Sequence, residues 1–149
     1  MNIFVLSPCP VESAKLLDNR RVIKMILESV QLLSTSINML GGKGPYKSTH
    51  VNHPCTVWTR TSKSNAEWLI KHLESLCAEY TKRYNKVHKC VEYIPTLKSN
   101  INIIPDIGLT PFENCTKFKE IDDVFLAYQL ALNDKWEQDS IKGYEPRWE

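Results

Sequence analysis

Two long stretches of the sequence carry apolar residues at intervals of three and four positions. The apolar positions of residues 19 to 40 are Val22, Ile26, Val30, Leu33, Ile37 and Leu40, and those of residues 64 to 84 are Leu69, Leu73, Leu76, Tyr80 and Tyr84. This spacing places each set on one face of an α-helix, and both faces then bury themselves against a common core. The sequence therefore predicts an all-α fold built on two long amphipathic helices.

The other segments are shorter and are separated by glycine and proline. Further helices are predicted after Pro10, from Pro54 to Trp58, from His88 to Tyr93, and from Asp123 to about Trp136 with Asp122 as its N-cap. The stretch bounded by Pro95, Pro105 and Pro111 is expected to be irregular.

The apolar opening MNIFVLS ends at Ser7-Pro8, which indicates a strand or an extended arm pinned into the core. No second boundary interrupts the chain. Residues 1–149 are thus expected to be a single compact helical domain with two long and several short helices and an N-terminal extended arm.

Composition and charge bear on the cellular compartment of the protein and on its binding partners. The net charge of +2 means that nucleic-acid binding would depend on where lysines and arginines lie and not on a strongly basic domain. The five cysteines stand at irregular spacing without a CxxC pair, which favours free thiols in the cytoplasm, or the host-cell cytoplasm for a viral protein. No apolar run reaches the length of a membrane span, and no signal peptide is recognisable. No cofactor is implied.

The first long helix has a polar stripe as well as an apolar face. Arg20 or Arg21, Lys24 and Glu28 recur every three or four residues, so that their side chains form one continuous edge with Gln31 and Thr35 beyond them. Two or three cations beside one carboxylate suit a phosphate group. A solvated helix face with a Lys24–Glu28 pair explains the same residues equally well.

The loop after that helix contains His50, His53 and Cys55, and His88 and Cys90 follow later in the chain. Imidazoles and thiols are zinc ligands, but their spacing matches no recurrent zinc pattern, so no metal site is predicted. Loop histidines that hydrogen-bond a phosphate, a base edge or the backbone are the favoured interpretation.

The second long helix ends in a basic run with interleaved tyrosines that includes Glu79, Arg83 and His88. Tyrosines beside cations can stack and hold unpaired nucleotides. A surface pair between Glu79 and Arg83 over buried tyrosines is the alternative. Since the two long helices leave their polar edges at one rim, we expect a single pocket formed by the stripe, the histidine loop and this run.

Motifs of the common enzyme classes are missing. GGKG at residues 41 to 44 lacks the spacing of a phosphate-binding loop, and neither GxSxG nor HExxH occurs. However, the order of MNIFVLS, NRRVIKMILESVQLL and THVNHPCTVWTRTSKSNAEWLIKHLESLCAEYTKRYNKVHK over residues 1 to 90 resembles uncharacterised phage and bacterial proteins. These are distantly similar to phage pyrimidine-dimer DNA glycosylases of the endonuclease V type.

That resemblance implies a helical domain that clamps DNA and a buried arm that places the chain's α-amine in the active centre. In such enzymes the amine attacks the sugar C1′ and forms an imine, an acidic residue of the first long helix assists, and two arginines hold phosphates. Matching NRRVIKM to the family places Arg20 and Lys24 on the arginines but Arg21 on the glutamate. Met1 would supply the amine, and Glu28 could replace the glutamate only if the helix were rotated or shifted.

Three hypotheses follow for the function. The first is a DNA base-excision glycosylase or lyase acting on DNA. The second keeps the scaffold without the reaction and sequesters a nucleotide or nucleotide-derived signal, as a viral counter-defence protein would. The third is a helical domain that binds a partner protein and has no small-molecule site.

Overall fold

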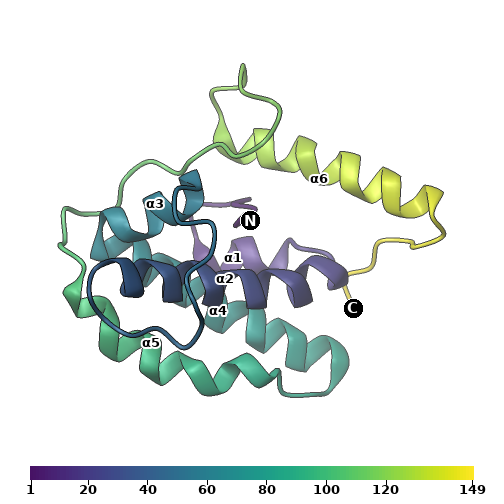
Figure 1. The fold of residues 1–149 in the computed structure, drawn as a ribbon. Helices are drawn as coiled ribbons and strands as arrows, with labels where there is room; N and C mark the ends of the chain where they lie inside the picture. Colours follow the sequence, from purple (N-terminus) through teal and green to yellow (C-terminus); the bar gives the residue numbers. More distant parts are fainter.

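The computed structural model describes residues 1–149, and its longest helices follow the two periodic stretches of the sequence (Figure 1). In chain order the elements are α1 (Pro10–Lys15), α2 (Asn19–Met39), α3 (Pro54–Thr61), α4 (Lys63–Tyr84), the 3-10 helix η1 (Lys89–Tyr93), α5 (Ile94–Asn100), the 3-10 helix η2 (Ile101–Ile103) and α6 (Val124–Ile141). No residue lies in a β-strand. The predicted all-α fold is confirmed.

The core forms where α2 and α4 pack against each other and against α1 and α3. The predicted apolar positions of α2 up to Ile37 are fully buried, as are Leu69, Leu73 and Leu76 of α4. Leu40 is 40% exposed, because α2 ends at Met39 and Leu40, its C-cap, no longer has helical backbone angles. None of the helices is both long enough and apolar enough to span a membrane.

The N-terminal arm, residues 1–6, has no regular secondary structure, turns at Phe4, and lies between α6 and the layer of α1 and α2 (Figure 1). Ile3, Phe4 and Val5 are buried. The ring of Phe4 meets the ring of Tyr128 of α6 edge-on at a centroid distance of 6.1 Å. Helix α6 thus covers the arm from the side opposite α2.

The start of α6 and the stretch between Pro95 and Pro111 differ from the prediction. The N-cap of α6 is Asp123 and not Asp122, because the Asp123 carboxylate accepts from the N–H groups of Phe125 and Leu126. The stretch predicted to be irregular contains α5 and η2. Pro95 lies in the first turn of α5, where no intrahelical N–H is needed, so it opens a helix there and does not break one.

Candidate active site

The loop that follows α2 is bound flat against that helix. Thr35 Oγ1 donates to the carbonyl of Thr49 at 3.2 Å and accepts from the N–H of Thr49 at 3.0 Å. At Gly44 the approach is so close that a Cβ would lie 2.5 Å from the Cα of Ser34. These contacts bring His50 to the edge of α2, in a left-handed conformation with φ of 48°.

A cavity of about 450 Å³ opens between α2, this loop and η1. Its polar lining consists of Lys24, Glu28, Gln31, His50, His88 and Lys89. Ile23, Leu27 and Tyr46 provide apolar walls, and Met1 lies at the cavity as well. The volume falls within the range of pockets that bind small ligands, so that one nucleotide-sized group can enter.

The chain's α-amine and a carboxylate meet at this cavity. The nitrogen of Met1 lies 3.6 Å from Oε1 of Glu28, and the two side chains are only 4% and 13% exposed. Oε2 of Glu28 is buried and has no hydrogen-bond partner. A buried carboxylate oxygen without a partner is costly in free energy, so Oε2 can accept a further hydrogen bond from a group in the cavity.

Local hydrogen bonds position the amine. Asn2 Oδ1 accepts from the N–H of Phe4 at 3.0 Å, and Ser13 Oγ of α1 accepts from the N–H of Leu6 at 3.0 Å. Phe4 has a φ of 54°, an unusual conformation for an aromatic residue that costs roughly 1–3 kcal/mol. The surrounding core holds this strained turn, and the turn directs Met1 towards Glu28.

The histidines cap helices. His53 is the N-cap of α3 and His88 is the N-cap of η1, and in each the Nδ1 atom accepts from the backbone N–H two residues on, at 3.1 Å. Partial burial lowers the pKa of both side chains. Both rings are therefore neutral near pH 7 and carry their proton on Nε2, from which they can donate a hydrogen bond.

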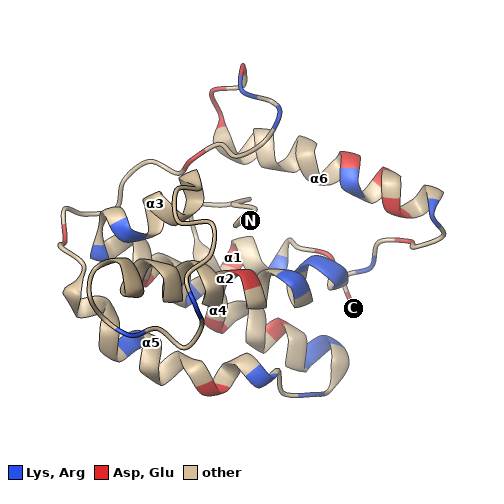
Figure 2. Ribbon diagram, viewed as in Figure 1, with Lys and Arg blue, Asp and Glu red and all other residues tan.

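Two lysines of the cavity are free of carboxylates. Lys24 of α2 and Lys89 of η1 are exposed and take part in no ion pair of the structure. Basic positions recur in the first half of α2 and in the turn after α4 (Figure 2). With the Nε2–H donor of His88, these cations make the cavity suitable for an anionic ligand.

The sequence of this chain matches the model of one protein family. A family model described as pyrimidine dimer DNA glycosylase matches residues 1–92, which is more than half of the chain. The chain belongs to this family. No curated protein and no solved structure matches in the other two comparisons. The part that matches the pyrimidine dimer DNA glycosylases includes the amine, α2, the histidine loop and His88, whereas α5 and α6 lie beyond it.

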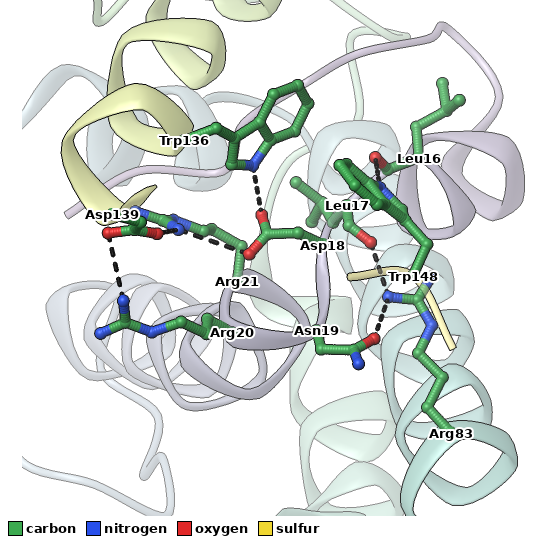
Figure 3. A network of polar contacts seen from close by, with 10 residues as sticks. All are labelled: Leu16, Leu17, Asp18, Asn19, Arg20, Arg21, Arg83, Trp136, Asp139 and Trp148. Carbon is green, nitrogen blue, oxygen red and sulfur yellow. Dashed lines mark hydrogen bonds and ion pairs between the residues drawn. The ribbon is translucent and has the colours of Figure 1, made fainter. Parts of the chain in front are cut away.

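The two arginines of the predicted phosphate site pair with a carboxylate of α6 (Figure 3). Asp139 forms an ion pair with Arg20 at 3.1 Å and is also paired with Arg21. Arg21 donates in addition to Asp18 at 3.3 Å, and Trp136 Nε1 donates to the other oxygen of Asp18 at 2.8 Å. Neither arginine lines the cavity. Arg21 is half-buried between its two carboxylates, whereas the Arg20 side chain is exposed.

The position matched to the family glutamate is thus occupied by a structural arginine. Glu28 stands seven residues after Arg21, about two turns along the same helix, and it is Glu28 that lies beside Met1. The match of NRRVIKM to the family motif therefore does not locate the carboxylate nearest the amine. Met1, the first residue of the arm, lies at the level of Glu28, two turns along α2 from Arg21.

Arg83 and Glu79 also lie outside the cavity. Arg83 donates to the carbonyls of Leu17 at 2.6 Å and Lys15 at 3.1 Å, and to Glu79 at 3.2 Å (Figure 3 shows the contact with Leu17). Its side chain is 3% exposed. Arg83 therefore holds the residues that follow α1 against α4, and its charge is paired with that of Glu79.

One cluster was missed in the sequence. His53 and Cys55 have ligand atoms within 4.8 Å of those of Cys115, which comes from the loop before α6. The sequence had suggested His88 and Cys90 as their partners, but Cys90 faces Tyr46 at the cavity. A pairing across 60 residues has no local signal in the sequence.

The structure thus gathers five of the predicted site residues and separates the others. Met1, Lys24, Glu28, His50 and His88 line the cavity. Arg20, Arg21, His53, Glu79 and Arg83 do not, contrary to the expectation of one pocket. Gln31, Tyr46 and Lys89 line it too, and of these only Gln31 belonged to the predicted stripe.

Proposed function

We propose that the protein is a DNA glycosylase with a lyase step, in which the α-amine of Met1 is the nucleophile and Glu28 assists it. The observation that carries this proposal is the 3.6 Å approach of the two groups at a cavity with free cations. The membership of the pyrimidine dimer DNA glycosylases supports DNA as the substrate class.

The proposed reaction follows from these two groups. The lone pair of the amine attacks C1′ of a deoxyribose, and the bond between C1′ and the base breaks with its electron pair on the base, which takes up a proton. The nitrogen then loses its two protons, one through Glu28 to the departing base and one to O4′ as the C1′–O4′ bond breaks with its electron pair on the oxygen. The sugar ring thereby opens, and an imine forms between Met1 and C1′. The Glu28 carboxylate accepts a proton from the amine and stabilises the positive charge that develops on the sugar.

Lysine side chains at the cavity carry amines that could also act as the nucleophile. The assignment of this role to Met1 can therefore be tested against them. Lys24 also lines the cavity, but α-amines as a class release their proton more readily than lysine side chains do. Lys24 is therefore assigned to phosphate binding in this proposal.

Borohydride trapping tests the proposal directly. The protein is incubated with duplexes carrying an abasic site, a pyrimidine dimer or a hypermodified base, in the presence of borohydride, which reduces an imine to a stable covalent link. We expect a protein–DNA adduct whose peptide map places the link on Met1. Protein acetylated at its N-terminus is the control and should give no adduct. An adduct on Lys24, or none with any duplex, would reject Met1 as the nucleophile.

The same cavity supports the second candidate, capture of a single nucleotide. Its volume suits one such ligand, and two unpaired lysines suit its phosphate. A duplex clamp neutralises several phosphates, whereas a nucleotide pocket neutralises one or two. The salt dependence of affinity therefore distinguishes the two functions.

Replacing Lys24 and Lys89 together by alanine provides that measurement. For a DNA clamp we expect binding to weaken and the slope of log K against log salt to become shallower by roughly 2, about 1 for each lost phosphate contact. The matched control is Lys98→Ala. Lys98 does not line the cavity, and its Nζ lies 3.0 Å from a carboxylate oxygen of Glu74. A nucleotide that binds tightly with little salt dependence, together with unchanged duplex binding in the double variant, would favour sequestration.

A further inference from the structure

Two thiols that the proposed reaction does not use face each other between α3 and the loop before α6. Sγ of Cys55 lies 3.0 Å from Sγ of Cys115. Cys55 is 2% exposed, whereas Cys115 is partly exposed and lines a separate surface hollow between the N-terminal arm and α6. One thiol is therefore reachable from solvent, and the other lies buried behind it.

The surroundings make the outer thiol the more reactive one. Accepting a hydrogen bond from the Cys55 thiol lowers the pKa of Cys115 in spite of its burial, and the charge of Lys119 adds to this effect. Donating the same hydrogen bond, together with burial, raises the pKa of Cys55. A thiolate is the attacking species in thiol chemistry, so that Cys115 reacts first and Cys55 second.

A metal site fits this cluster less well, although His53 lies beside the sulfur atoms. Nδ1 of His53 already accepts from the N–H of Cys55, so its proton is on Nε2 and neither nitrogen is a free ligand. Two thiolates on one zinc ion, with bonds of about 2.3 Å in a tetrahedral arrangement, stand roughly 3.8 Å apart. The observed 3.0 Å is shorter than that separation.

We propose that Cys55 and Cys115 form a reversible disulfide and are a site of oxidative modification. With a small disulfide such as oxidised glutathione as the oxidant, the Cys115 thiolate attacks one of its sulfur atoms and releases a thiolate, leaving a mixed disulfide on Cys115. Cys55 then loses its proton, attacks the Cys115 sulfur and releases the second small thiol. One small disulfide is reduced to two thiols, and the protein pair is oxidised.

The disulfide would join the family-matched part of the chain to the part that follows it. Cys55 lies within residues 1–92, and Cys115 lies beyond them. The closed loop spans 60 residues, and closing a loop of this length restricts the unfolded chain strongly. Oxidation should therefore raise the stability of the folded protein.

The test is oxidation of the full chain by oxidised glutathione at graded ratios to reduced glutathione. Of the five free thiols, we expect two to be lost, with one cross-linked peptide pair containing Cys55 and Cys115, and full reversal by dithiothreitol. The Tm should rise by roughly 5 °C or more on oxidation. The matched control is Cys9→Ser, because Cys9 is an exposed thiol at the start of α1 and is not part of this pair, and it should behave like the unaltered protein.

The variants Cys55→Ala and Cys115→Ala distinguish the thiol that attacks first, Cys115, from the thiol that closes the disulfide, Cys55. Cys55→Ala should stop at a mixed disulfide on Cys115, and Cys115→Ala should keep Cys55 reduced. The peptide map of the unaltered chain decides the matter even where a variant does not fold. A glutathione adduct that persists on Cys115, a disulfide involving another cysteine, or one zinc ion per chain bound with loss of both thiols would overturn the proposal.

Discussion

Glu28→Gln is expected to lower the rate of base release by roughly 10²- to 10⁴-fold, the range of a positioned acid–base group. Glutamine keeps the size of the side chain and can still accept a hydrogen bond from Met1, which lies 3.6 Å from Glu28. It removes the negative charge that would receive the amine proton and stabilise the sugar cation. Single-turnover cleavage of the duplex that gives an adduct in the trapping experiment measures the loss.

Glu79→Gln is the matched control for this prediction. Glu79 is a half-buried carboxylate in a cation pair, as Glu28 is, but it lies outside the cavity beside Arg83. We expect its rate of base release to stay within a few-fold of that of the unaltered protein. Equal rates for the two variants would show that Glu28 does not assist, and an intact borohydride adduct on Met1 would then leave the amine as nucleophile.

Arg21→Met is expected to destabilise the protein by about 3–5 kcal/mol, the range for the loss of one partner from a buried charge network. Arg21 neutralises Asp18, which is 1% exposed, and Asp139, which belongs to α6 (Figure 3). Burial alone would lower the pKa of Arg21, but its bond to Asp139 and the charges of both aspartates outweigh burial and raise it. Methionine fills the volume and leaves two carboxylates without a cation. Urea unfolding followed by circular dichroism measures the change.

Arg20→Met distinguishes this buried network from a surface pair. Arg20 also contacts Asp139, at 3.1 Å, but its side chain is 53% exposed, so that we expect a loss of no more than about 1 kcal/mol. Equal losses for the two variants would contradict the distinction.

The bond from Arg21 lowers the pKa of Asp139 in the folded state. The stability from this pairing is therefore complete above about pH 4 and is lost as pH falls through the lowered folded pKa.

The helices were predictable because their signals are local. The spacing of Val22, Ile26 and Val30 sets the buried face of α2 by itself, and the same holds for Leu69 and Leu73 of α4. Caps were less certain, since Asp122 and Asp123 are both acceptable N-caps and only the path of the loop selects the second. The residue types at the cavity, a stripe with Lys24 and Glu28 and a loop with His50, were also apparent from the sequence.

The partners of these side chains depend on segments that are distant along the chain. Arg21 and Asp139 are 118 residues apart, and no periodic pattern links α2 to α6. The sequence by itself therefore determined the helices, their buried faces and the family. Only the tertiary structure decided that Glu28 meets Met1, that Arg21 pairs with two aspartates, and that Cys55 faces Cys115. The physical reason is that helical periodicity is a property of neighbouring residues, whereas a charge or a thiol acquires its role from whichever group the packed core brings within a few ångströms of it.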